Sequence, residues 1–186
     1  MKLPHWLYFL SLEKDFIKTI EYVEFDSSNE LTFSIVYTKL YLSICSEVDV
    51  VAKLLCKKIF STSNSSNINQ YRSKIVDKYP NFHTVECLIP RYSLKLYPWA
   101  SWSESKTPSW WKDYNNVTHE RNLYSNLANQ KNVRDSLCGL FCMLLYFYQS
   151  EFYIGDLVPI PNLLDYERMS GYMSINPGVV LPDIPK

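Results

Sequence analysis

Apolar residues recur at three- and four-residue steps in several stretches of the chain, which is the spacing of one face of an α-helix. The first such stretch is residues 6–24, where charged residues such as Glu13 and Lys18 fall between the apolar positions. We predict an amphipathic helix here. Residues 31–60 follow a polar break and are too apolar to leave a clear polar face. They predict a long central helix that is buried on most sides.

The next part of the chain changes its pattern. Residues 61–69 are a polar loop, after which a short helix is predicted to stop before Pro80. Residues 85–89 and 92–96 then alternate apolar and polar positions, as a strand does. Because Pro90 interrupts the pair, we predict either a small β-hairpin or an extended strap.

Helical spacing returns in the last third of the chain. We predict a helix from Ser109 to about Arg121, and a final long helix that is capped by Asn129 or Asn132 and reaches Tyr148. The apolar run in the final helix has twelve residues, well short of the roughly 20 that cross a bilayer, so we expect a buried helix and no membrane span.

The end of the chain is rich in proline. Five prolines follow Gly155, so residues 155–186 are expected to form an extended tail that packs on the bundle or on a partner. The pattern as a whole predicts an all-α fold: one helical bundle spanning residues 1–186, with a small β-hairpin or strap inserted.

Composition limits the class of protein. The chain has 186 residues, 47% of them hydrophobic, and its 19 basic side chains balance 19 acidic ones. A disordered chain is therefore excluded, and neutrality argues against a simple polyanion-binding protein. The charge is uneven, however, because residues 70–135 hold ten Lys and Arg against six Asp and Glu. Any basic surface should lie in this middle part.

Cysteine and histidine give no sign of a metal or cofactor site. The five Cys are scattered without a CxxC pair, and the three His form no cluster with them. We expect buried free thiols, no metal, no cofactor and a reducing compartment, hence a cytoplasmic location. The N-terminus lacks the features of a signal peptide.

One segment has the composition of a site. On a helix that starts at Ser109, Lys112, Asn115, Asn116 and His119 fall on one face, because successive residues turn by about 100°. Tyr114 and Val117 fall on another face that suits packing. A histidine can take a proton from a ribose 2′-hydroxyl while a nearby cation stabilises the developing phosphate charge, which would be RNA cleavage without a metal. The structural alternative is that His119 and the Asn side chains only make hydrogen bonds within the bundle.

A second polar feature lies in the central helix. Glu47 shares a face with apolar residues, so it should point inward and need a partner, for which His119 or Arg121 is available. The carboxylate would then either orient a catalytic histidine or lock two helices together.

The segments WWKDYNNVTHER and SNLANQKNVRDSLCGLFCMLLYFY, with SEVDVVAK and IPRYSLKLYPW before them, resemble HEPN-type all-α bacterial proteins over roughly residues 30–148. The resemblance implies a helical bundle that dimerises and, in many members, a metal-independent ribonuclease of toxin–antitoxin or phage-defence systems. The active motif of the family is Arg, four to six residues, then His. His119 matches the His, whereas Tyr114, Asp113 and Lys112 stand where the Arg would be.

Two hypotheses follow from these residues. In the first, the protein binds or cleaves RNA, with His119, Lys112 and Glu47 as catalytic residues and Asn115, Asn116 and Arg121 as RNA contacts. In the second, it is a non-catalytic dimeric module with a degenerate site, whose aromatic residues bind another copy, a cognate antitoxin or a defence protein. A small-molecule enzyme has less support, because no nucleophile or cofactor motif is recognisable.

Overall fold

The computed structural model describes residues 3–149, 157–166 and 181–184 of the chain. Within them, the α-helices are α1 (Pro4–Ile20), α2 (Ile35–Ile59), α3 (Ile68–Lys78), α4 (Ser109–Tyr124) and α5 (Gln130–Phe147). The strands β1 (Cys87–Ile89) and β2 (Leu94–Leu96) form an antiparallel pair. This confirms the predicted all-α bundle with an inserted hairpin.

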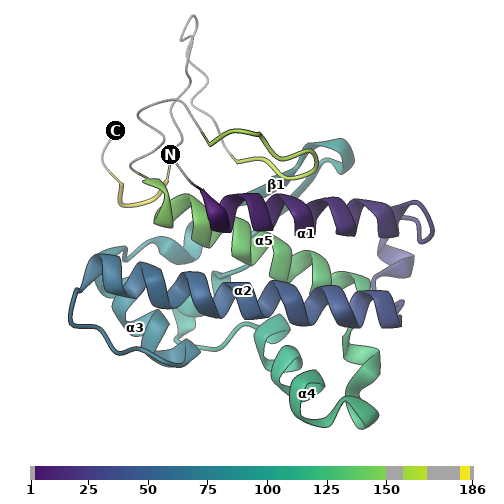
Figure 1. Cartoon of the computed structure of the whole chain (residues 1–186), viewed down its shortest axis with the longest axis horizontal. Coiled ribbons are helices and arrows are strands. Elements are labelled where there is room, and N and C mark those ends of the chain that lie inside the picture. Colours follow the sequence, from purple (N-terminus) through teal and green to yellow (C-terminus); the bar gives the residue numbers. More distant parts are fainter. Residues whose placement is uncertain (1–2, 150–156, 167–180, 185–186) are drawn as a thin grey trace, which may run out of the picture.

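Helices α1, α2 and α5 form the centre of the bundle. In Figure 1, α1 and α2 lie side by side and run in opposite directions, and α5 packs behind both of them. Helices α3 and α4 lie on the side of α2 away from α1, with α4 near the beginning of α2. Each central helix therefore has its apolar face covered by two neighbours, which is what a buried α2 and α5 require.

Three helices begin at a side chain that caps them. Ser34, Asn67 and Asn129 each accept a hydrogen bond from the backbone N–H three residues later. Asn129 is thus the cap of α5, and Asn132 is not. These caps satisfy N–H groups that lack a partner within the helix.

The predicted boundaries of the first two helices need correction. Helix α1 begins at Pro4 and ends at Ile20, four residues earlier than predicted. Helix α2 begins at Ile35 rather than near residue 31, because Phe33 is extended and forms a β-bridge with Asn129. Here pairing to a distant segment replaces a local helical preference.

Both strands of the hairpin are shorter than predicted, and a segment of the tail pairs with the other edge of β1. Cys87 pairs with Leu96 and Ile89 with Leu94 across β1 and β2. On its other side, Leu88 exchanges two backbone hydrogen bonds of 2.8 Å with Asp165. Residues 157–166, which are a described part of the proline-rich tail, therefore pack on the bundle. Residues 150–156, 167–180 and 185–186 lie outside the described residues.

Glu13 was predicted to be one of the polar positions of an amphipathic helix, but in α1 it is buried. Its side chain is fully buried, and its carboxylate accepts hydrogen bonds of 2.9 Å from the backbone N–H groups of Asn162, Leu163 and Leu164. A buried carboxylate is stable when such donors replace water. Glu13 thus fixes segment 157–166 against α1.

An aromatic cluster joins α4 to α5. Trp99 and Trp110 pack at 5.1 Å between ring centroids, and Trp99 donates a hydrogen bond to the carbonyl oxygen of Gly139. A Cβ atom at Gly139 would lie only 2.8 Å from the Trp110 ring, so α5 needs glycine at this contact. The cluster fixes the beginning of α4, the segment that the sequence singled out as a site.

Within the described part of the chain, every helix is too short or too polar to span a bilayer. The five cysteines are buried and free. The described residues contain no group of His, Cys, Asp and Glu that could hold a metal ion.

Candidate functional site

The inner face of α4 is anchored to the bundle. Val117 is buried, and Tyr114 packs against Tyr41 of α2, with ring centroids 6.1 Å apart. The Tyr41 hydroxyl donates a hydrogen bond to the carbonyl oxygen of Trp110. This confirms the prediction that Tyr114 and Val117 form a packing face.

A polar contact fixes the same helix to α5. The Asn132 side-chain amide donates to the Asp113 carboxylate at 2.9 Å and to the backbone carbonyl of Leu127, also at 2.9 Å. Asp113 is therefore held by Asn132. One of the two acidic side chains of α4 thus already has a hydrogen-bond partner, and the second, Glu120, is exposed.

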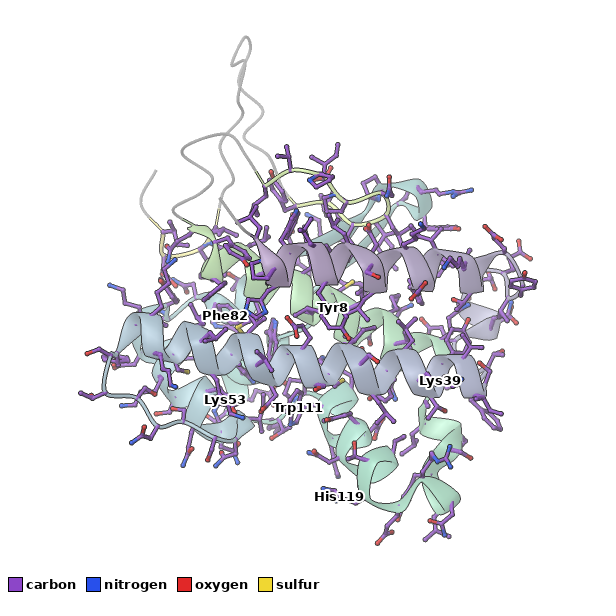
Figure 2. The ribbon with its side chains drawn as sticks, viewed as in Figure 1. Tyr8, Lys39, Lys53, Phe82, Trp111 and His119 are labelled. Atoms are coloured by element: carbon purple, nitrogen blue, oxygen red, sulfur yellow. The ribbon has the colours of Figure 1, made fainter. Side chains whose placement is uncertain are left out.

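The outer face of α4 carries the predicted site residues. Lys112, Asn115 and His119 are exposed, and Asn116 is half-buried. Figure 2 shows His119 on the part of α4 away from α2, whereas Trp111 lies beside α2. Among the described residues, neither Lys112 nor His119 has an ion-pair partner, so both are available to a ligand.

Arg121 does not continue this face in helical register. Glu120 has φ −138° and ψ 53°, which breaks the helix immediately after His119. Arg121 is exposed beyond the break and has no ion-pair partner among the described residues. The structure thus places two cations, a histidine and an amide on the surface of one protruding element.

The catalytic assignment of His119 stays a prediction. A carboxylate that hydrogen-bonds one ring nitrogen holds an imidazole in a single tautomer and orientation. Within the described residues, no carboxylate bonds to His119. The predicted partner, Glu47, lies elsewhere.

Glu47 pairs with His5, and not with His119 or Arg121. Its Oε1 lies 2.6 Å from Nδ1 of His5, and the Glu47 side chain is only 10% exposed. The prediction that Glu47 points inward and needs a partner is confirmed, but the predicted partners were wrong. His5 precedes Glu47 by 42 residues and lies on α1, which packs antiparallel to α2.

Sequence reasoning did not identify His5 as a functional candidate. The residue stands in the first turn of α1, where its spacing from Phe9 and Phe16 resembles any helix position. A signal was present nonetheless, because a buried Glu needs a cationic or hydrogen-bonding partner and the chain has only three histidines. Choosing between them requires the pairing of α1 with α2.

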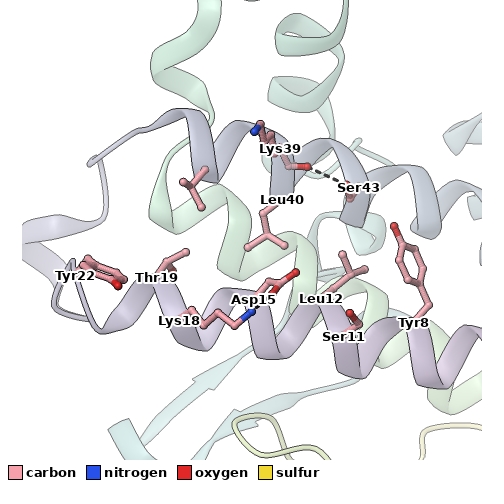
Figure 3. Close-up of a pocket in the computed structure, with 11 residues that line it drawn as sticks. Tyr8, Ser11, Leu12, Asp15, Lys18, Thr19, Tyr22, Lys39, Leu40 and Ser43 are labelled. Atoms are coloured by element: carbon pink, nitrogen blue, oxygen red, sulfur yellow. Dashed lines mark hydrogen bonds and ion pairs between the residues drawn. The ribbon is translucent and has the colours of Figure 1, made fainter.

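A groove of about 400 Å³ lies between α1 and α2. We call it the α1–α2 groove. Figure 3 shows Tyr8, Asp15, Lys18 and Tyr22 along its α1 side, with Lys39 and Ser43 on its α2 side. Its floor is apolar and its rims carry hydroxyl groups and cations. Lys18 is paired with Asp15 at 2.7 Å, whereas Lys39 has no ion-pair partner among the described residues.

The His5–Glu47 pair does not line the groove but lies one helical turn beyond Tyr8 and Ser43, which do. Tyr8 follows His5 by three residues on α1, and Ser43 precedes Glu47 by four residues on α2. Residues three or four apart are neighbours on one helix face, so the pair continues the two rims of the groove. The imidazole remains 23% exposed.

Comparison of the chain with protein-family models, curated proteins and solved structures gives no match. The function must therefore be argued from the residues themselves.

Proposed function

We propose that the protein binds RNA through the outer face of α4. The observation that carries this proposal is the set of side chains on a protruding helix: Lys112 and Arg121, cations without an ion-pair partner in the described part of the chain, with Asn115, Asn116 and His119 between them. Cations attract the phosphate backbone, and amide and imidazole groups hydrogen-bond to phosphate, sugar or bases. Residues 70–135 contain more Lys and Arg than Asp and Glu, and this net positive charge also favours contact with a phosphate backbone.

The resemblance to HEPN-type proteins supports this proposal, because RNA is the substrate of many members. We therefore extend it to a HEPN-like bundle of a bacterial defence or toxin–antitoxin system. Binding and cleavage are separate questions, since an RNA-binding surface needs no oriented base.

The salt dependence of binding tests the proposal. Fluorescence anisotropy with labelled single-stranded and hairpin RNA, measured between 50 and 300 mM salt, gives the slope of log affinity against log salt. Lys112→Ala and Arg121→Ala should each weaken binding and reduce the slope by about 0.7 for single strands, the amount for one lost phosphate contact. Lys78→Ala, an exposed cation on α3, serves as the matched control. Equal binding by all four proteins would refute the assignment to α4.

A second candidate function is a dimeric interaction module, and an apolar surface favours it. Leu31, Phe33, Ile35 and Val36 are all more than half exposed at the beginning of α2. Four such side chains within six residues are unusual on a surface that contacts only water. The second copy would cover them.

Sedimentation equilibrium tests this candidate. Ile35→Asp should shift a dimer of the full chain to monomer, since it would bury a charge in the interface. Val50→Asp, at an exposed position further along α2, should leave the mass unchanged. A wild-type protein that is monomeric at all concentrations and binds no partner through this surface would contradict the candidate.

A further inference from the structure

The His5–Glu47 pair has the geometry of an oriented base. The carboxylate at 2.6 Å from Nδ1 favours the tautomer that carries its proton on Nδ1 and leaves Nε2 free to accept one. The Phe147 ring meets the imidazole edge-on, with centroids 5.8 Å apart, and limits its rotation. His119, in contrast, is exposed on α4 and has no carboxylate partner among the described residues.

The groove next to the pair is elongated and has a volume of about 400 Å³. Tyr8 lies on α1 and Tyr22 lies two residues beyond its end; the helical part between them, from Tyr8 to Ile20, is about 18 Å long at 1.5 Å per residue. This length exceeds a single small ligand. Their rings are accessible, with Tyr22 87% exposed, and bases stack on such rings without sequence preference.

The charges of the groove favour an anion. Asp15 compensates Lys18, which leaves Lys39 as a cation without an ion-pair partner in the described residues. A phosphodiester group carries one negative charge, which would balance the one positive charge of Lys39. Helix α2 contacts both α1 and α4, so it lies between the groove and the helix that carries the proposed RNA-binding face.

We propose that a single-stranded part of the bound RNA enters the α1–α2 groove and that His5, oriented by Glu47, is the base that cleaves it. This inference rests on the proposed RNA binding and assigns the chemistry to a different histidine. Nε2 of His5 takes the proton of a ribose 2′-hydroxyl, and O2′ attacks the adjacent phosphorus. The bond between phosphorus and O5′ breaks, and O5′ takes a proton from the imidazolium. The products are a 2′,3′-cyclic phosphate and a 5′-hydroxyl end.

The experiment separates binding from cleavage in the full-length protein. Labelled single-stranded RNA is incubated in EDTA with saturating protein, and the rate constant of a single turnover is measured beside the Kd. His5→Ala should lower the rate constant by at least about 100-fold, the usual contribution of a general base, and change the Kd less than threefold. Glu47→Gln should lower it by about 10- to 100-fold, as loss of an orienting partner does. His83→Ala is the matched control, on a histidine whose Nδ1 lies 3.1 Å from the carbonyl oxygen of Pro80.

Chemical rescue distinguishes a base from a structural lock. The space left in His5→Ala opens to solvent, so free imidazole in the buffer should restore part of the rate, which a lost helix contact would not allow. Cyclic phosphate ends, loss in His5→Ala and rescue by imidazole together support the proposal. RNA that is bound but not cleaved by the wild type, or cleaved equally by His5→Ala, overturns it and leaves RNA binding intact. Absence of RNA binding refutes the proposed function itself.

Discussion

Glu13 is the residue on which the attachment of segment 157–166 depends. Its buried carboxylate is the shared acceptor for three consecutive backbone N–H groups, each at 2.9 Å. Hydrogen bonds to a charged group contribute about 1.5–3 kcal/mol each. The variant Glu13→Ala removes the acceptor and leaves the donors facing an apolar surface.

The magnitude follows from comparing two responses to this loss. If the segment stays in place, the two buried N–H groups of Leu163 and Leu164 lose their partners, which costs at least about 2 kcal/mol, and the part-buried N–H of Asn162 adds to this. If it detaches, the burial of Leu163 and Leu164 is lost, at about 1.5–3 kcal/mol for each, but backbone entropy is regained. Detachment is the cheaper response. We therefore expect the free energy of unfolding to fall by about 2–4 kcal/mol.

Two measurements check this prediction. Urea unfolding followed by circular dichroism gives the loss of stability, and hydrogen exchange reports the amides of residues 162–164, which should lose their protection in Glu13→Ala. Asp15→Ala is the control, because its ion pair with Lys18 is solvent-exposed and contributes less than about 1 kcal/mol. Slow exchange of the Leu163 and Leu164 amides in Glu13→Ala would refute the reasoning, since the carboxylate would then not hold the segment.

Three further predictions concern the bundle. Gly139→Ala should destabilise it by about 1–2 kcal/mol in urea unfolding, because the clash with Trp110 outweighs the better helix propensity of alanine; a gain in stability would contradict the close contact. Tyr41→Phe should cost about 1–2 kcal/mol in the same assay, since the carbonyl oxygen of Trp110 loses its donor, and an unchanged midpoint would count against that bond. Burial raises the pKa of the Cys56 thiol to about 11 from a usual 9.0, so the folded state holds this proton more tightly than the unfolded state. Its contribution to stability is therefore lost between about pH 9 and pH 11, and Cys56→Ser should reduce this alkaline loss in urea titrations.

Local patterns determined most of the helices correctly, because the forces that set them are local. The spacing of apolar residues predicted α2, α3, α4 and α5, and Asn129 begins α5 where a cap was expected. The errors lie where a distant segment competes. Phe33 leaves the helical pattern to pair with Asn129, and Leu88, besides its partner in the hairpin, forms a β-bridge with Asp165. Neither pairing can be recognised from the ten or fifteen residues that surround each partner in the sequence.

Some features of the candidate site could likewise be predicted from the local sequence, and others could not. The outer face of α4 followed from the helical repeat, and Lys112, Asn115 and His119 are exposed as that repeat required. The break at Glu120, which takes Arg121 out of register, has no local cause in the sequence, since glycine and proline are both absent from this turn.

Glu47 shows what can and cannot be deduced about a buried charge. That a carboxylate among apolar residues needs a partner follows from the cost of desolvation, which does not depend on the fold. Which partner it finds depends on how two helices are aligned, and a shift of one helical turn along α1 would place Tyr8 or Phe9 rather than His5 opposite it. The alignment is set by the whole α1–α2 interface and by the contacts of both helices with α5. The existence of a polar pair inside this bundle is thus a property of the sequence, whereas its identity, and with it any chemistry of His5, is a property of the fold.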